Sequence, residues 1–222
     1  MTTAEGRAPT TASTASPEQG PTTEQGPATA PGGRATATTP HAPTPSQTVG
    51  PFFGHALPTT GGPDIAPLAH PDTITLHGYV YDGAGAPVHD ALLEIWQPGP
   101  DGSRAGAPGS LRRDPVTGRA AGRDGVTFTG FGRVPTDADG HWAIRTLPPG
   151  GAPYLSVALF ARGLLNHLRT RAYLRDDPDD ALLTTLDASR RATLLAQAGP
   201  HRTYRFDIRL QGDGETVFLE FA

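Results

Sequence analysis

Short runs of alternating apolar and polar positions dominate the chain after residue 72. In residues 72–82, one face carries Ile74, Leu76, Gly78 and Val80, and the other carries Thr75, His77, Tyr79 and Tyr81. A repeat of two is the period of a β-strand that buries one face. Similar runs occupy residues 88–97, 141–146, 153–161 and 204–210. The pattern therefore predicts a series of short strands.

Turn residues separate these runs. Residues 83–87 read "GAGAP" and residues 136–140 read "TDADG", while the stretch 98–110 is too rich in Gly and Pro for regular structure. The last run is expected to form a hairpin over residues 204–222, with its turn near the "GDG" of residues 212–214. Many short strands with frequent turns favour an all-β fold, an antiparallel β-sandwich with long loops.

One short helix is expected within residues 176–199. Acidic residues and a proline stand at the start of this stretch, and a glycine stands near its end. The acidic pairs Asp176–Asp177 and Asp179–Asp180 are interpreted as a solvated cap on a surface turn.

The N-terminal segment has a different composition. From Thr2 to Thr48 there is no Val, Ile, Leu, Phe, Tyr or Trp. Such a segment buries too little apolar surface to offset its ordering entropy. We therefore expect residues 1–43 to be a disordered tail and residues 44–222 to be one folded domain.

Charge and composition exclude several classes of function. A net charge of −4 and a pI near 6.0 do not fit a nucleic-acid-binding protein. The chain has no Cys, which excludes disulfides and thiolate metal sites. No run reaches the length of a membrane span, and no apolar signal-peptide segment stands at the N-terminus. A cytoplasmic protein that binds no membrane is expected.

Common catalytic motifs are also missing. No serine lies in a nucleophile elbow, and there is no phosphate-binding or dinucleotide-binding glycine motif. None of the eight His residues is spaced from another as a ligand pair on a strand or a helix. His167 is interpreted as a polar residue at a strand edge. Composition and periodicity alone indicate no more than a soluble β-sandwich.

Three segments carry a family resemblance. "GYVYDGAGAPVHDALLEIWQ" (78–97), "GFGR" (130–133) and "TDADGHWAIRTLPPG" (136–150) resemble the intradiol ring-cleaving dioxygenases. The resemblance implies a transthyretin-like β-sandwich. In that family, two Tyr and two His hold a non-haem Fe(III) ion, and a catecholic substrate reacts with O2.

The ligand positions of that family are not kept in this chain. Arg104 stands at the first Tyr position, the second Tyr has no clear counterpart, and Tyr154 and Ser156 stand at the His-x-His pair. The resemblance therefore implies no iron in this chain. "TPSQTVGPFF" (44–53) and "SVALFARGLLNHLRTRAYL" (156–174), with the ending 204–221, resemble the non-metal α subunit of a heteromeric member of the family. Its partner, a β subunit in αβ units, holds the Fe(III).

The resemblance implies a reaction and a set of substrate-binding residues. The holoenzyme is expected to open 3,4-dihydroxybenzoate with O2 between its two hydroxyl-bearing carbons, giving 3-carboxy-cis,cis-muconate in aromatic catabolism. The α subunit walls part of the pocket with positions that match Thr48, Gly50, Pro51, Phe52 and Arg162. Arg162 would point toward the substrate carboxylate.

Other interpretations stay open. Phe52 and Phe53 could instead be a hydrophobic staple at the entry of the domain, and Arg162 could be an ordinary surface residue. The whole chain could be a non-catalytic transthyretin-like binding module, or an independent enzyme that uses another metal. The segments "TPSQTVGP" and "FARG" favour the subunit interpretation, because a generic sandwich has no reason to keep them.

Overall fold

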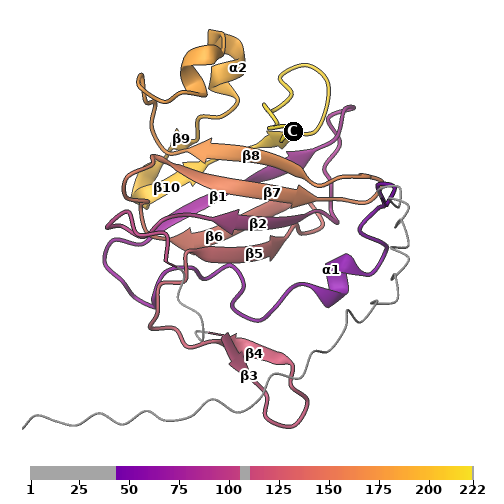
Figure 1. Ribbon diagram of the computed structural model, residues 1–222, viewed down its shortest axis with the longest axis vertical. Coiled ribbons are helices and arrows are strands. Elements are labelled where there is room, and N and C mark those ends of the chain that lie inside the picture. The colour runs from indigo at the N-terminus through magenta and orange to yellow at the C-terminus, as the bar shows by residue number, and fades with distance from the viewer. Residues whose placement is uncertain (1–43, 106–110, 222) are drawn as a thin grey trace, which may run out of the picture. The chain divides into compact units, whose positions relative to one another are not determined.

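A computed structural model describes residues 44–105 and 111–221 of the chain (Figure 1). The predicted tail, residues 1–43, lies outside this part, and its disorder stays a prediction. Within the described residues, no helix has the length and apolar character that crossing a bilayer requires.

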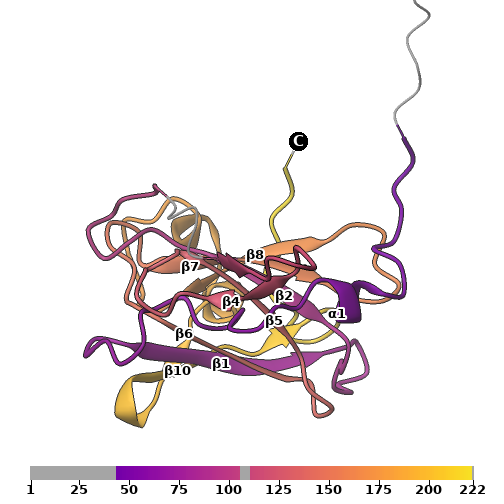
Figure 2. The same cartoon turned by 90° about the horizontal axis from the view of Figure 1, so that it is seen from below.

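Two β-sheets form the two layers of the domain, as Figure 2 shows with β7 and β8 in one layer and β1 and β10 in the other. The first sheet contains β1 (Ile74–Tyr81), β6 (His141–Thr146), β9 (Gln197–Ala198), β10 (Thr203–Arg205) and β11 (Ile208–Arg209). The second sheet has the order β5 (Phe131–Pro135), β2 (Leu92–Trp96), β7 (Tyr154–Phe160), β8 (Leu168–Tyr173). A small hairpin joins β3 (Leu111–Arg113) to β4 (Ala120–Arg123).

The alternation in the sequence matches the burial in the fold. Ile74, Leu76, Gly78 and Val80 of β1 are buried, and the residues between them are partly exposed. The main core lies between the sheets and includes Leu76, Val80, Leu93, Ile95, Trp142, Ile144, Val157 and Leu159. The predicted β-sandwich is therefore confirmed, and the runs at residues 72–82, 141–146 and 153–161 contain β1, β6 and β7.

Strand direction is mixed rather than purely antiparallel. In the second sheet, β2 runs antiparallel to both β5 and β7. In the first sheet, β1 is antiparallel to β6 but parallel to β10 and β11. The period of two cannot distinguish these arrangements, since side chains alternate in both.

The predicted helix is much shorter than the stretch 176–199. The chain forms a 3₁₀ turn, η1 (Leu183–Thr185), and one α-helix, α2 (Ala188–Ala192). Asp187 interrupts the helical path, because it is extended and its side chain accepts from the N–H of Arg190 as an N-cap. After α2, Leu194 accepts from the N–H of Tyr173 at 2.8 Å, so the chain runs along β8 instead. Two short helical elements were not predicted, α1 (Phe53–Ala56) and η2 (Pro200–Arg202).

The predicted C-terminal hairpin is wrong. The N–H of Thr216 donates to O of Arg209 at 3.0 Å, so the chain does reverse, but residues 216–221 form no second strand. Instead, the N–H of Leu219 donates to O of Arg169 at 2.7 Å, along the edge of β8. Val217 packs with Tyr173, Leu183 and Leu194 in a second apolar cluster, which draws the segment away from β11.

Candidate functional site

The positions that match the iron ligands of the family lie together. Arg104, Tyr154 and Ser156 line one cavity of about 300 Å³ beside Trp96 and Gln97. Tyr154 and Ser156 are two residues apart on β7, so both side chains leave the same face of the sheet. Trp96 pairs with Ser156 in the register of β2 and β7. We call this cavity the Arg104 pocket.

The chemistry of the Arg104 pocket does not fit a ferric ion. Among the residues that line this pocket, only Tyr154 could supply a phenolate oxygen, the kind of ligand that Fe(III) prefers. The guanidinium of Arg171 lies 4.3 Å from the centre of the Tyr154 ring. Arg104 adds a second cation beside it. Two guanidinium groups repel a trivalent cation, and a serine hydroxyl is a weak ligand. Within residues 44–105 and 111–221, no group of three or more His, Asp or Glu side chains could hold a metal ion.

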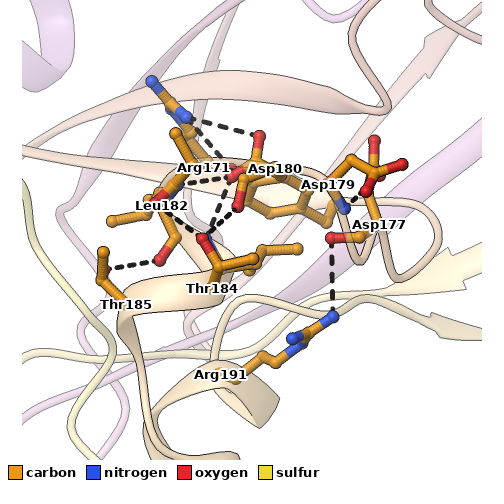
Figure 3. A network of polar contacts seen from close by, with 11 residues as sticks. Arg171, Asp177, Asp179, Asp180, Leu182, Thr184, Thr185 and Arg191 are labelled. Carbon is orange, nitrogen blue, oxygen red and sulfur yellow. Dashed lines mark hydrogen bonds and ion pairs between the residues drawn. The ribbon is translucent and has the colours of Figure 1, made fainter.

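A polar network holds Arg171 in place (Figure 3). Nη1 of Arg171 donates to the hydroxyl of Tyr173 at 3.1 Å, and that hydroxyl donates to Oδ1 of Asp180 at 2.9 Å. The same Oδ1 accepts from the N–H groups of Leu182 and Leu183 at 2.9 and 3.0 Å. The network connects β8 to the segment before η1, and it fixes the cation over Tyr154.

Burial and hydrogen bonds set the ionisation of this network. Burial raises the pKa of Tyr173 to about 12, so the phenol stays neutral. Burial alone would raise the pKa of Asp180, but the hydrogen bonds from Leu183, Tyr173 and Leu182 outweigh it and lower that pKa. The interpretation of Asp180 as a solvated cap is wrong, because its side chain is 12% exposed. Asp176 and Asp179 are exposed, but Asp176 pairs with Arg191 rather than with solvent alone.

The N-terminal loop with Thr48, Gly50, Pro51 and Phe52 precedes α1. Gly50 has a φ of +82°, a backbone conformation that other residues rarely adopt. Phe53 is buried and anchors the loop, whereas Phe52 points to solvent. The staple interpretation therefore applies to Phe53 only. Thr48 and Pro51 are also exposed.

A second cavity lies between this loop and the end of β7. Gln47 and Val49 line it from the loop, and residues 160–161 and 164–167 line it from the other side, around a volume of about 310 Å³. The structure therefore brings the loop next to the segment that carries Arg162. His167 lines this cavity as an exposed residue just before β8, as its strand-edge interpretation predicted.

Arg162 lies at the rim of this region. Its Nε donates to Oδ2 of Asp90 at 2.9 Å, and its side chain is 70% exposed. No hydrogen bond joins Arg162 to Thr48, Gly50, Pro51 or Phe52 in the described parts of the chain. The role of these five residues in binding substrate stays a prediction.

Sequence reasoning missed an aromatic surface on the outer side of the second sheet. Trp96 is 54% exposed and packs against Phe131 at 4.4 Å between ring centres. A groove of about 510 Å³ runs from Trp96 past Phe160 and Arg169 to Phe221, which is also exposed. We call Trp96, Phe160 and Phe221 with this groove the aromatic face. In the alternation of β2, Trp96 stands at a position whose side chain points away from the core. This pattern is the sequence signal that could have revealed the aromatic surface. Large exposed apolar residues that gather on one face mark an interaction surface.

Comparisons with known proteins give close relatives. The chain is 39% identical over 202 residues to the protocatechuate 3,4-dioxygenase alpha chain of Burkholderia cepacia and 38% identical over 207 residues to that of Pseudomonas putida. Each match covers 80% of this chain and 96% of the relative. No family model matches the chain.

A beta chain and a solved dioxygenase domain are more distantly similar. The beta chain of the Burkholderia cepacia enzyme is 28% identical over 193 residues, which cover 72% of this chain and 78% of the relative. Among solved structures, the dioxygenase domain of a carbohydrate-binding fusion protein from Streptomyces sp. SirexAA-E is 27% identical and covers 77% of this chain and 99% of its own, with a TM-score of 0.47. The alpha-chain relatives show the family, and the solved dioxygenase domain does not. At 38–39% identity over almost their full length, this chain belongs to the family of protocatechuate 3,4-dioxygenase alpha chains.

Proposed function

We propose that this chain is the non-metal α subunit of a heteromeric protocatechuate 3,4-dioxygenase. Its similarity to two alpha chains, over 96% of their length, is the observation that carries the proposal. The enzyme would cleave 3,4-dihydroxybenzoate with O2 between the hydroxyl-bearing carbons and release 3-carboxy-cis,cis-muconate. Both oxygen atoms of O2 enter the product, so no further reductant is needed.

The partner in this proposal is an iron-bearing β subunit of the same enzyme. The Arg104 pocket supports this division of roles, because Arg104 and Ser156 stand at ligand positions of the family and the guanidinium of Arg171 lies over Tyr154. Fe(III) is therefore assigned to the partner, and no step of the ring opening is assigned to this chain.

The aromatic face is the surface that we assign to the partner. Trp96 and Phe221 expose large apolar areas on the same side of the second sheet, and Arg169 and Arg171 line the groove between them. Aromatic and Arg side chains are the residues that most often dominate protein interfaces.

The substrate contacts in this proposal come from the N-terminal loop and the end of β7. Thr48, Gly50, Pro51 and Phe52 would wall the pocket of the partner, and Arg162 would pair with the substrate carboxylate. Two features support this assignment. The loop and the Arg162 segment line one cavity, and Arg162 extends its guanidinium into solvent, where a second chain could bring a ligand.

The test is to purify this chain alone and together with its β-type partner. We expect the chain alone to hold no stoichiometric iron, to lack the visible tyrosinate-to-iron absorption, and to open no substrate. The complex should contain iron and consume O2 with 3,4-dihydroxybenzoate. A single chain that is active with another metal would support the independent-enzyme interpretation instead, and an iron-loaded single chain would refute the subunit proposal. Failure to bind the β-type chain would favour a non-catalytic transthyretin-like module. The cytoplasmic location stays a prediction.

A further inference from the structure

We propose that Asp90 is a positioning residue for Arg162. It holds the guanidinium by Nε and leaves both Nη groups free for the carboxylate of the aromatic substrate. This inference rests on the proposed function, in which Arg162 faces the substrate. The inference goes beyond the proposed function because it names the residue that orients Arg162. That residue, Asp90, lies in the turn before β2.

The backbone of Arg162 is already fixed by a tight turn. Residues 161–164 form this turn, in which the N–H of Leu164 donates to O of Ala161 at 3.3 Å. Gly163 has a φ of +88°, as the third position of a type II turn requires. Ala161 is buried and anchors the start of the turn. The turn places the Cα atom of Arg162, but it does not restrict the long, exposed side chain.

The ion pair with Asp90 supplies the restriction. Leu92 of β2 pairs with Phe160 of β7, and the pairing of the two strands ends there. Asp90 lies in the turn before β2 and Arg162 in the turn after β7, so the end of this pairing brings the two turns close together. Nε of Arg162 donates to Oδ2 of Asp90 at 2.9 Å.

Hydrogen bonds from Thr136 fix the segment that carries Asp90. The hydroxyl of the buried Thr136 donates to O of Val88 at 2.8 Å and accepts from the N–H of Ala91 at 3.0 Å. The N–H of Thr136 donates to O of Ala91 at 2.9 Å. One buried threonine therefore clamps the residues on both sides of Asp90. The Asp90 side chain is 23% exposed against 70% for Arg162, so the aspartate is the packed partner and the arginine the exposed one.

The geometry of the pair leaves the arginine able to bind a second anion. A guanidinium carries five N–H donors in a rigid fork, and the contact to Asp90 uses the one on Nε. Nη1 and Nη2 make no hydrogen bond to any other described residue. Those two groups form the edge that pairs side by side with a carboxylate. Asp90 would thus order the Arg162 side chain before the substrate arrives. Substrate binding would then not include the entropy cost of ordering that side chain.

The experiment compares Asp90→Asn with wild type in the full complex with the β-type subunit. Asparagine keeps the size and removes the charge. We expect KM for 3,4-dihydroxybenzoate to rise about 2- to 10-fold, the effect of leaving one rotamer-rich side chain to be ordered on binding. The value of kcat should stay within about 2-fold, and catechol, which has no carboxylate, should be unaffected. Asp72→Asn, which removes the partner of the exposed Arg202, is the matched control and should change nothing.

A double-mutant cycle separates this inference from the function on which it rests. If Asp90 acts through Arg162, then Asp90→Asn should add no loss in the background of Arg162→Ala. An unchanged or lower KM in Asp90→Asn, or an additive loss in the double variant, would overturn the inference. If Arg162→Ala still selectively impairs 3,4-dihydroxybenzoate, the proposed function survives that result. If Arg162→Ala affects neither substrate, the pocket role of Arg162 itself is wrong.

Discussion

Replacing Trp96 by alanine should strongly weaken assembly with the β-type subunit. Trp96 is 54% exposed in the single chain. A large aromatic side chain buries about 150–250 Å², so the area still open to a partner is roughly 80–135 Å² by that measure. At about 25 cal/mol per Å², covering it contributes about 2–3.4 kcal/mol. We therefore expect the dissociation constant to rise about 30- to 300-fold.

The assay is the dissociation constant of this chain for its β-type partner, measured by titration calorimetry. Leu68→Ala is the matched control, because Leu68 is 66% exposed but lies beside Arg145 of β6, on the other sheet. A change of less than about 3-fold for Trp96→Ala, or equal losses for both variants, would refute the assignment of the aromatic face to the partner. Each variant should keep the melting temperature of the wild-type chain, since neither side chain is part of the core.

Three further outcomes are expected. In the complex, Arg162→Ala should lower kcat/KM for 3,4-dihydroxybenzoate about 10- to 150-fold relative to catechol, the effect of one lost charge-assisted pair; Arg162→Lys should recover only part of it, and equal losses on both substrates would mean a structural role. Asp180→Asn should destabilise the chain at pH 7 by about 2–3 kcal/mol in denaturant unfolding. Its hydrogen bonds lower the pKa of Asp180 in the folded state, so this stabilisation exists above the unfolded carboxyl pKa of about 3.9 and fades as the pH falls through the folded value; a difference between variant and wild type that did not shrink as the pH fell below about 3.9 would contradict the cause. Deleting residues 2–42 should leave the melting temperature of the complex unchanged, because the segment has no large apolar side chain to contribute to a core; a fall of several degrees would show that it docks.

Much of the fold followed from local patterns in the sequence. The period of two in residues 74–81 predicted a strand with Leu76 and Val80 inward, and both are buried. The turn "TDADG" correctly placed the start of β6 at His141. Such features depend on neighbours in the chain, so a single sequence contains them. The mismatch at Arg104 and Ser156 could also be read from the sequence, since ligand chemistry is a property of residue type.

Only the tertiary structure decided which distant segments meet. Residues 216–221 were expected to pair with the preceding strand, yet Val217 packs with Tyr173 in the second apolar cluster and the segment forms no strand. The stretch 176–199 has helix signals, yet Leu194 is drawn to the edge of β8. The ion pair of Asp90 with Arg162 joins two turns that lie 72 residues apart in the chain. Contacts of this kind join side chains that are far apart in the chain, so a local pattern does not contain them. The local pattern determined the strands and their buried faces, and the packed fold determined which segments they meet.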